Sequence, residues 1–548
     1  MIFELSDVDA LGRIGYIKIN NKEIITPNLF PVIHPSKNVV TTNELKSIGA
    51  QGVFTNAYII YNNESIRAEV LRKGIHKFLN YDGIVATDSG AFQQYMYNDN
   101  NININAETIE KFQEAIGSDF PVILDVPLQL NDPYEVACIK LNNTLNRAKE
   151  NVLRRTRPES YWFGPIHGGM YSDLLEECCR EMNKMNFAVY AIGGLVKAFM
   201  DYRFDLTTKI LITAKKILNP NKPIHMFGLG LPQYFALAVA CGCDLMDSAA
   251  YILYAKEDRY FTLSSGTKNL QELEEFPCHC PVCTAYTPKE LRESKENVKI
   301  NLLSKHNLYI SFSELRTIRQ AIREGNLWEL LELRIRNHPK LVKAFKNLKK
   351  HISFIEIFEK TYKNHGRLYS STESILRPDF YRYRKKLINY YRPPKHVKLM
   401  IILPELDIKG EKSPSVNSWI TKINNEVSFH RGELHIYYFS AIYGIIPEEL
   451  VDSFPLGQYE TIYPLTPVNS IYNNALRTTE AFLVKSFKNY ERCYTLIPKT
   501  FYNEFNDECH FPKNHPINKL INIFNKIKLS EFTVFDNIDD LIKDLKLL

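Results

Sequence analysis

The sequence predicts an α/β protein whose main part is a closed (β/α)8 barrel, the TIM-barrel architecture. Eight short apolar runs recur in the first half of the chain, each ends in a polar residue or a glycine, and amphipathic stretches separate them. Buried strands that alternate with helices are typical of parallel βα units, and eight such units fit a closed barrel. An open doubly wound sheet is the alternative, but no glycine-rich dinucleotide fingerprint follows the first run to favour it.

Length and composition indicate a folded protein of several domains. The chain has 548 residues, of which 45% are hydrophobic, and a formal net charge of +6. This length predicts two to four domains, and the small positive excess is compatible with a polyanionic partner. Because we find no charged-then-apolar leader and no apolar run long enough for a membrane span, we expect a cytoplasmic protein with no membrane partner.

The predicted barrel follows a hairpin. Residues 15–26 alternate apolar and polar side chains around Asn20-Asn21, a pair that favours a tight turn. Amphipathic stretches at 134–157, 171–186 and 205–218 supply helices between strands. The eight strand-like runs are LFPVIHP, GVFTN, GIVATDSG, FPVILDVP, YWFGPIHGG, FAVYAIGG, PIHMFGLG and CGCDLMDS.

Carboxylates lie at the ends of three of these runs, where the loops of a (β/α)8 barrel build the active site. They are Asp88, Asp125 and Asp247. A buried carboxylate must be paired or used, so we predict that Asp88 and Asp247 face each other across one pocket. Such a pair can divide the roles of nucleophile and general acid/base, as in retaining glycosyl transfer. For each aspartate alone, a helix cap or a loop hydrogen bond is the alternative.

Residues near these strand ends suit a planar ligand. Phe92, four residues after Asp88, can supply a face for stacking, or it is an ordinary core aromatic. Gly193 and Gly194 can expose backbone N–H and C=O groups to a ligand edge, or they form a plain strand-to-helix turn.

A cysteine cluster after the eighth run predicts a metal site. Cys278, Cys280 and Cys283 give the spacing C-x-C-x2-C, and His306 lies 23 residues beyond the last of them. Three thiolates and one imidazole form the closed tetrahedral shell of a structural Zn²⁺ site, and the metal would supply the folding energy of a loop with little core. We expect one structural zinc ion in an inserted subdomain at about 276–310; three unpaired thiols with an unrelated histidine are the alternative. A helical pattern at 314–336 then closes the barrel.

The second half of the chain predicts smaller α+β C-terminal domains. We expect the catalytic domain at 1–345, a small basic and aromatic helical accessory domain at 346–396, and an α/β accessory domain at 397–548. The segment 377–396 suits an RNA surface, with Arg and Lys on phosphates and Tyr rings stacking on bases, or it is a solvated amphipathic helix. Further basic residues lie nearby, at Lys340, Lys343, Lys346, Lys349 and Lys350.

Several long motifs together resemble one family. TDSGAFQ, YAIGGL, FGLGLPQYFALAVACGCDLMDSAAYILYAKEDRYFT and CHCPVCTAYTPKEL are similar to the tRNA-guanine transglycosylases, and the last two come closest to the archaeal branch, the archaeosine tRNA-ribosyltransferases. The resemblance is dense over 1–310 and persists in STESILRPDFYRYRKKL and FSAIYGIIPEELVDSFP. It implies a tRNA-modifying enzyme of archaeosine biosynthesis that exchanges guanine at position 15, in the D arm, for 7-cyano-7-deazaguanine (preQ0) through a covalent aspartyl–ribose intermediate.

The resemblance also implies roles for individual residues. Asp247 would attack C1′ of the ribose and Asp88 would take the proton of the incoming base; which aspartate is the nucleophile stays open, and both are predicted to be catalytic. Asp125 would accept hydrogen bonds from the base, which must be flipped out of its stack. His167 stands where the family has a glutamine that contacts the base's carbonyl, which leaves base preference open. The predicted substrate-binding residues are Asp125, Phe92, Ser89, His167, Gly193, Gly194, Leu195 and Val196.

The C-terminal region departs from the pattern of the archaeal branch, whose members end in a PUA domain. Residues 500–548 indicate helices instead, so we expect tRNA binding either without such a domain or with a separate PUA-domain protein. The resemblance also implies a homodimer. Alternative functions are an archaeosine synthase, a non-catalytic tRNA-binding subunit and a (β/α)8 hydrolase. The synthase signature Pro-Cys is absent, because Glu405 follows Pro404.

Overall fold

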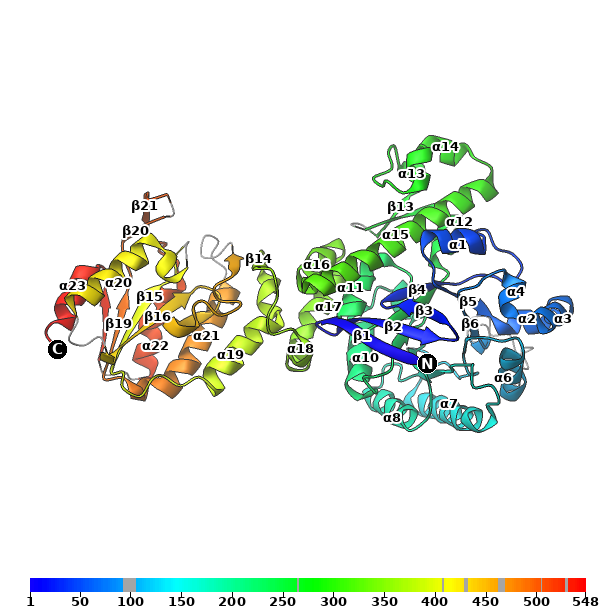
Figure 1. Ribbon diagram of the computed structural model, residues 1–548, viewed down its shortest axis with the longest axis horizontal. Coiled ribbons are helices and arrows are strands. Elements are labelled where there is room, and N and C mark those ends of the chain that lie inside the picture. Colours follow the sequence, from blue (N-terminus) through cyan, green and yellow to red (C-terminus); the bar gives the residue numbers. More distant parts are fainter. Residues whose placement is uncertain are drawn as a thin grey trace. The chain divides into compact units, whose positions relative to one another are not determined.

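The computed structural model describes the chain in two compact units, Met1–Lys360 (unit 1) and Thr361–Leu548 (unit 2) (Figure 1). The sequence-based division at 345 and 396 stays a prediction. The residues described are 1–91, 105–263, 266–406, 409–427, 432–461, 469–503, 505–527 and 531–548. Within them, no helix combines the length and the apolar character that crossing a membrane requires.

Eight parallel strands form a closed ring in unit 1. Two sheets, in the orders β5-β6-β7 and β4-β11-β10-β9-β8, are joined by parallel bridges from Val32 to Phe54 and from Val122 to Phe163. Each strand falls in one of the eight apolar runs, so the predicted closed barrel is confirmed. The strands are β4 (Asn28–Pro31), β5 (Gly52–Asn56), β6 (Ile84–Asp88), β7 (Phe120–Pro121), β8 (Phe163–Ile166), β9 (Val189–Ile192), β10 (Ile224–Met226) and β11 (Leu245–Ser248).

Helices surround the barrel, as the amphipathic stretches predict. The three longest predicted stretches correspond to α7 (Tyr134–Arg154), α8 (Ser172–Asn183) and α10 (Phe204–Ile217). Each turns its apolar side to the strands, because parallel strands are covered on both faces. The others in this part are α1 (Thr42–Ile48), α2 (Ala57–Asn62), α3 (Glu64–Lys73), α4 (Ile75–Leu79), α6 (Ala106–Ala115), α9 (Val196–Met200), α11 (Pro232–Ala240) and α12 (Ala250–Lys256).

A small antiparallel sheet covers the amino-terminal end of the barrel. The predicted hairpin is confirmed as β2 (Gly12–Ile19) and β3 (Lys22–Ile25), and β1 (Ile2–Asp9), which the sequence did not reveal, adds a third strand. Asn20 and Asn21 both have positive φ, 46° and 63°, which a tight two-residue hairpin turn requires. Ile17 and Ile24 pack with Phe30 and Leu245 in the same apolar cluster, which closes this end.

The cysteine-bearing insert follows the eighth strand. It contains β12 (Arg259–Thr262), β13 (Gly266–Asn269), α13 (Pro281–Ala285) and α14 (Pro288–Glu293), and the long α15 (Glu296–Glu324) returns from it to the barrel. Figure 1 shows α13 and α14 at the far end of α15. The helical pattern expected at 314–336 is divided between α15 and α16 (Leu327–Arg334), because Gly325 ends α15 with φ 74°. Unit 1 ends with α17 (Pro339–Asn347), the 3-10 helix η3 (Leu348–His351) and α18 (Ile352–Phe358).

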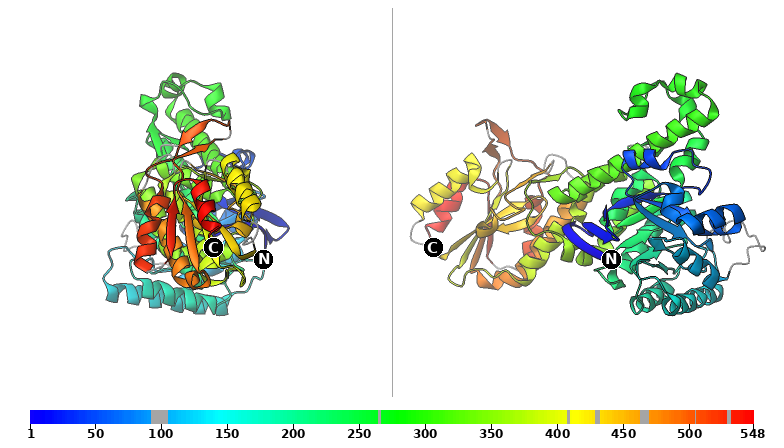
Figure 2. Two further views of the ribbon diagram at one scale, coloured as in Figure 1. Left: turned by 90° about the vertical axis from the view of Figure 1, so that its left-hand side faces the viewer. Right: turned by 45° about the vertical axis from the view of Figure 1, so that its right-hand side comes forward.

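Unit 2 is an α/β module. Its sheet has the order β17-β16-β15-β19-β22, parallel except for β17. In Figure 2, helices cover both faces of this sheet. The strands are β15 (Leu399–Pro404), β16 (Leu434–Ser440), β17 (Gly444–Pro447), β19 (Arg492–Leu496) and β22 (Phe532–Phe535), and the main helices are α19 (Pro378–Asn389), α20 (Pro414–Glu426), α21 (Asn469–Ser486), α22 (Leu520–Ile527) and α23 (Ile538–Leu545). Smaller strands are β14 (Arg367–Tyr369), β18 (Tyr459–Thr461), β20 (Thr500–Tyr502) and β21 (Glu508–His510).

The basic and aromatic segment 377–396 contains α19. Phe380 and Tyr383 of this helix are buried in the core of unit 2, whereas Arg384 and Lys386 are exposed. Two of its aromatic rings therefore serve packing, which favours the amphipathic helix over the stacking surface for that face.

Candidate active site and metal centre

A cavity of about 740 Å³ lies at the carboxyl ends of the barrel strands. Its wall contains Asp88 from β6, Asp125 after β7 and Asp247 from β11. The carboxyl ends of all eight strands meet at one end of a barrel, so aspartates far apart in the sequence come together here. Both predicted catalytic carboxylates thus line one cavity, while their roles stay predictions.

Asp88 ends β6, and its carboxyl titrates near neutral pH. The strand register pairs it with Asn56 of β5, whose Nδ2 donates to Oδ2 of Asp88 at 2.9 Å. Burial, followed by the charges of Asp125 and Asp247, raises the pKa of Asp88 to about 7. A carboxyl group with this pKa can both give and accept a proton at neutral pH.

Asp247 is held by two polar contacts at a single oxygen. His225 Nε2 lies 2.7 Å from Oδ1, and the Gly228 N–H donates to the same Oδ1 at 3.2 Å. Within the described part of the chain, no hydrogen bond reaches Oδ2. One oxygen of this carboxylate is therefore fixed by the protein, and the other is left for a ligand.

His225 belongs to β10 and was not singled out in the sequence. It is fully buried, and its ring lies among those of Phe54, Phe163 and Phe227 at centroid distances of 5.8, 5.2 and 5.0 Å. Its Nδ1 has no hydrogen-bond partner in the residues that the structure describes. The only sequence signal is a polar ring inside an apolar run, which more often marks an ordinary core histidine.

Asp125 has a histidine partner as well. His167, after β8, places Nε2 at 2.5 Å from Oδ2 of Asp125, and both side chains are buried. A Cβ on Gly193 would lie 2.6 Å from Cε1 of His167, and one on Gly194 would lie 2.6 Å from the carbonyl oxygen of Leu128. Gly194 also has φ 74°, so both positions need glycine.

Only some of the remaining predicted substrate-binding residues line the cavity. The cavity wall includes His167, Gly193, Gly194 and Val196, but neither Ser89 nor Leu195. Ser89 is fully buried, and its hydroxyl donates to the Ile123 carbonyl at 3.0 Å. Phe92 lies outside the described residues.

Two lysines and a histidine share the same cavity, and none of them is among the predicted site residues. His34, Lys37 and Lys256 all line it. Burial, followed by the charges of Lys37 and Lys256, lowers the pKa of His34. Both ammonium groups therefore lie near His34 at the wall of this cavity, where they suit an anionic ligand group.

The four predicted metal ligands form one cluster. The donor atoms of Cys278, Cys280, Cys283 and His306 all lie within 4.8 Å of one another. Nδ1 of His306 is 3.5 Å from Sγ of Cys280 and 3.3 Å from Sγ of Cys283. Three thiolate sulfurs and one imidazole nitrogen can hold a metal ion with no open position.

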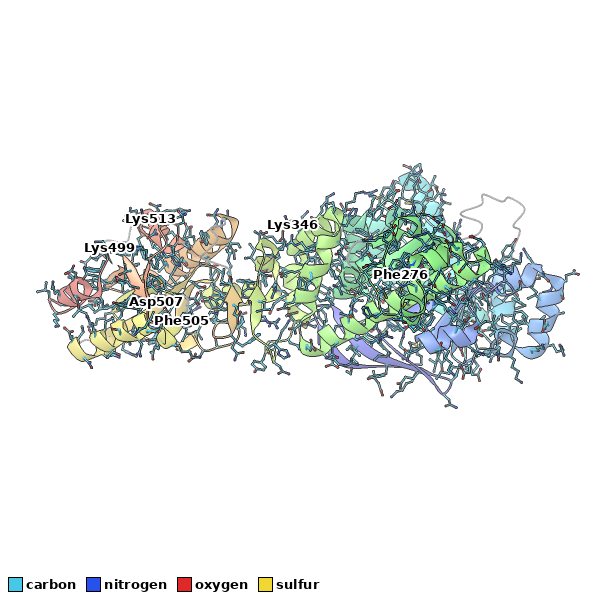
Figure 3. All side chains as sticks on the ribbon, turned by 90° about the horizontal axis from the view of Figure 1, so that it is seen from above. Phe276, Lys346, Lys499, Phe505, Asp507 and Lys513 are labelled. Carbon is cyan, nitrogen blue, oxygen red and sulfur yellow. The ribbon has the colours of Figure 1, made fainter. Side chains whose placement is uncertain are left out.

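The surroundings of His306 fix which nitrogen faces the cysteines. Nε2 lies 3.0 Å from the carbonyl oxygen of Phe261, so Nε2 carries the proton and Nδ1 is the ligand nitrogen. The Tyr260 ring stacks on the imidazole at 3.7 Å, and Phe276, labelled in Figure 3, stacks on the Tyr260 ring at 5.3 Å. These contacts orient the imidazole as a ligand, and the donor set fits a structural metal.

Comparison with known proteins gives a consistent result. The family described as queuine tRNA-ribosyltransferase matches residues 7–340. The tRNA-guanine(15) transglycosylase of Methanocaldococcus jannaschii is 40% identical over 467 residues, which cover 84% of this chain and 68% of that protein. That of Methanococcus aeolicus is 39% identical over 472 residues (85% and 68%), and that of Pyrococcus abyssi is 44% identical over 384 residues (70% and 65%).

Proposed function

The chain belongs to the queuine tRNA-ribosyltransferase family, and from this membership we propose the reaction that its cavity carries out. It is a pentosyltransferase that acts on tRNA and a guanine-type base. We propose that it exchanges guanine at position 15 of tRNA, in the D arm, for preQ0. The observation that carries this proposal is the set of three carboxylates in one cavity, each in a different environment.

The two halves of the exchange use the same two aspartates. Oδ2 of Asp247 attacks C1′ of the ribose, and the bond from C1′ to N9 of guanine breaks with its electron pair going to N9. Asp88 in its acid form gives a proton to the departing base. In the second half, N9 of the incoming base attacks C1′, its proton passes to the Asp88 carboxylate, and the ester to Asp247 breaks. The net reaction consumes neither water nor a proton.

Different parts of the cavity would bind the base and the tRNA. Asp125 can accept hydrogen bonds from the amino and ring N–H groups of the base, while Gly193 and Gly194 let the ring edge approach the backbone. Lys37 and Lys256 suit the phosphates that flank the flipped nucleotide. This division leaves the reacting ribose between Asp88 and Asp247.

Exposed lysines outside the cavity extend the tRNA surface in this proposal. Lys346 on α17, labelled in Figure 3, and Lys349 and Lys350 on η3 are exposed. Burial, followed by the charges of Lys216, Lys350 and Lys209, lowers the pKa of His351, which indicates that cations from α10 and η3 converge there. Such a surface attracts a phosphate backbone without reading its sequence.

We assign Zn²⁺ to the cysteine cluster, in a structural role. The support is the donor set of three thiolates and one imidazole, together with the oriented Nδ1 of His306. The homodimer and the separate PUA-domain partner stay expectations from the resemblance. A cytoplasmic location belongs to the same proposal, because tRNA is the substrate.

Base exchange tests the proposed function directly. Radiolabelled guanine is incubated with an unmodified tRNA transcript and the wild type, Asp247→Asn, Asp88→Asn or the exposed control Asp82→Asn, with preQ0 as competitor. We expect the wild type and the control to exchange the base, preQ0 to compete, and both cavity variants to be inactive. A covalent tRNA adduct that Asp88→Asn still forms, more slowly because its acid is missing, and that Asp247→Asn does not form at all would identify Asp247 as the nucleophile. A folded, metal-loaded wild type that never exchanges the base would refute the proposal.

A further inference from the structure

Two buried histidines each contact one of the three cavity aspartates. His225 Nε2 lies 2.7 Å from Asp247, and His167 Nε2 lies 2.5 Å from Asp125. The two imidazoles are 0% and 2% exposed, respectively. Asp88 differs, because its side-chain partner is the neutral amide of Asn56.

In the described part of the chain, Nδ1 of each imidazole lacks a hydrogen-bond partner, and this indicates which ring nitrogen carries the proton. A neutral ring with its proton on Nδ1 would bury an unsatisfied donor and turn the lone pair of Nε2 towards a carboxylate. A doubly protonated ring would also bury the Nδ1–H, and for His225 it would place a charge among phenylalanine rings. The remaining state is the neutral imidazole with its proton on Nε2.

No other ionised group among the described neighbours changes this assignment. Around His225 the titratable groups are Asp247, which it contacts, and Asp88, which interacts with Asp247 across the cavity. Around His167 they are Asp125 and Cys178, whose Sγ accepts from the backbone N–H of His167. Burial raises the pKa of Cys178 to about 12, so this thiol is neutral.

We propose that His225 and His167 are positioning residues: as neutral Nε2–H donors they keep Asp247 and Asp125 ionised and oriented, and so leave proton transfer to Asp88. This inference rests on the proposed function. With His225 and Gly228 both bonded to Oδ1, Oδ2 of Asp247 is the attacking atom. With His167 bonded to Oδ2 of Asp125, the other oxygen of Asp125 meets the base.

The same geometry changes the expectation for His167 itself. In the family that the sequence resembles, a glutamine at this position contacts the carbonyl of the base. Here the Nε2–H is taken by Asp125, and Nδ1 is buried behind Gly193. His167 therefore acts on the base through Asp125, and its Nε2–H is not free to donate to the base carbonyl.

Matched amide substitutions separate this role from packing. A glutamine amide nitrogen stands as many bonds from Cα as Nε2 of histidine, whereas an asparagine amide nitrogen corresponds to Nδ1. His225→Gln therefore keeps a donor near Asp247, and His225→Asn removes it at similar polarity. For His225→Asn we expect kcat to fall roughly 10- to 100-fold and the acid limb of the pH–rate profile to move up by about one to two pH units, because a hydrogen bond to a charge is lost. His225→Gln should keep the acid limb of the wild type.

Substitutions of the two histidines should also change different kinetic parameters, kcat for His225 and KM for His167. His167→Asn should raise KM for the base by roughly tenfold, and the acid limb should stay in place, because Asp125 binds the base and does not attack the ribose. Equal loss of kcat at all pH values in both His225 variants would overturn the proposal for His225. An unchanged KM for the base in His167→Asn would overturn the proposal for His167.

A measurement that needs no activity tests the protonation state. The full chain with ¹⁵N-labelled histidines is observed by NMR between pH 5.5 and 8.5, and the two resonances are assigned from the Asn variants. We expect both rings to be neutral with the proton on Nε2 throughout. An Nδ1–H tautomer or an imidazolium at pH 7 in either ring overturns the proposal, even if the wild type exchanges the base. If the wild type exchanges no base, the proposed function fails, and the NMR result still decides the state of the rings.

Discussion

Replacing Asp88 by Asn should abolish base exchange and yet stabilise the protein at alkaline pH. The side chains have the same shape, and the carbonyl oxygen of Asn can still accept from Asn56. The pKa of Asp88 is raised to about 7 in the folded protein by burial and by Asp125 and Asp247. In the unfolded chain an Asp titrates near 3.9. Folded Asp88 thus binds its proton more tightly, and the stability of the wild type falls as pH rises from about 4 to about 7.

The size of the effect follows from the pKa difference. Three pH units at 1.36 kcal/mol each give an upper limit of about 4 kcal/mol for keeping Asp88 ionised in the folded state. The carboxyl lines a cavity that water can enter, so screening reduces this figure, and we expect about 1 to 3 kcal/mol above pH 7. The variant should therefore melt roughly 1 to 4 °C higher than the wild type at pH 8, because unit 1 has 360 residues and a correspondingly large entropy of unfolding.

Thermal unfolding of the metal-loaded full chain at pH 4.5, 6, 7 and 8 measures this difference. The gain of Asp88→Asn should be about a quarter of its full value at pH 4.5, grow with pH and level off above pH 7. Asp82→Asn is the control, since the hydrogen bond from Lys46 lowers the pKa of this exposed carboxyl and no alkaline gain is expected. If Asp88→Asn loses stability by the same amount at every pH, the electrostatic reasoning for the cavity is wrong.

Further substitutions test the nucleophile, the metal and the tRNA surface. Asp247→Asn should lower exchange by at least about 1000-fold with tRNA affinity within threefold, as measured by filter binding, because an amide cannot attack C1′. Cys280→Ser should lose the metal and melt at least roughly 5 °C lower, while Cys509→Ser, outside the cluster, should keep the metal; metal analysis and calorimetry check this. Replacing Lys346 and Lys349 by Ala should raise KM for tRNA severalfold and reduce the salt slope of binding by about 2, with kcat unchanged. Full metal content in Cys280→Ser, or an unchanged salt slope in the lysine variant, would contradict the assignments.

The barrel could be predicted because its strands are buried on both faces, which makes each of them a continuous apolar run. The polar end of such a run then marks the carboxyl end of a strand, and this signal led to Asp88, Asp125 and Asp247. The cluster of three cysteines and one histidine could be predicted because the cysteines are close in sequence, and the histidine lies on α15 a short way beyond them. These features depend on local patterns, which a single sequence contains.

Other features depend on contacts that only the fold creates. His225 lies 22 residues before Asp247, and only the pairing of β10 with β11 brings the two together. Ser89 is among the predicted substrate-binding residues, and this role stays a prediction. Its hydroxyl donates to the Ile123 carbonyl and not into the cavity, because neighbouring residues of an extended chain face opposite sides. Register and side-chain direction therefore limited the prediction of the site more than residue type did.

The environments of the three carboxylates explain one another. Like charges in one cavity oppose each other, so the proton goes to the carboxylate with the weakest stabilisation. Asp247 and Asp125 each have an imidazole nitrogen within 2.7 Å, whereas Asp88, among the described residues, accepts only from neutral groups, the Asn56 amide and the backbone N–H groups of Ser89 and Gly90, and faces the charges of the other two. Burial, followed by the charges of Asp125 and Asp247, raises the pKa of Asp88, and these two charged neighbours are the ones that the histidines contact. Residues that need not touch the substrate can in this way determine which carboxylate attacks the ribose and which one carries the proton.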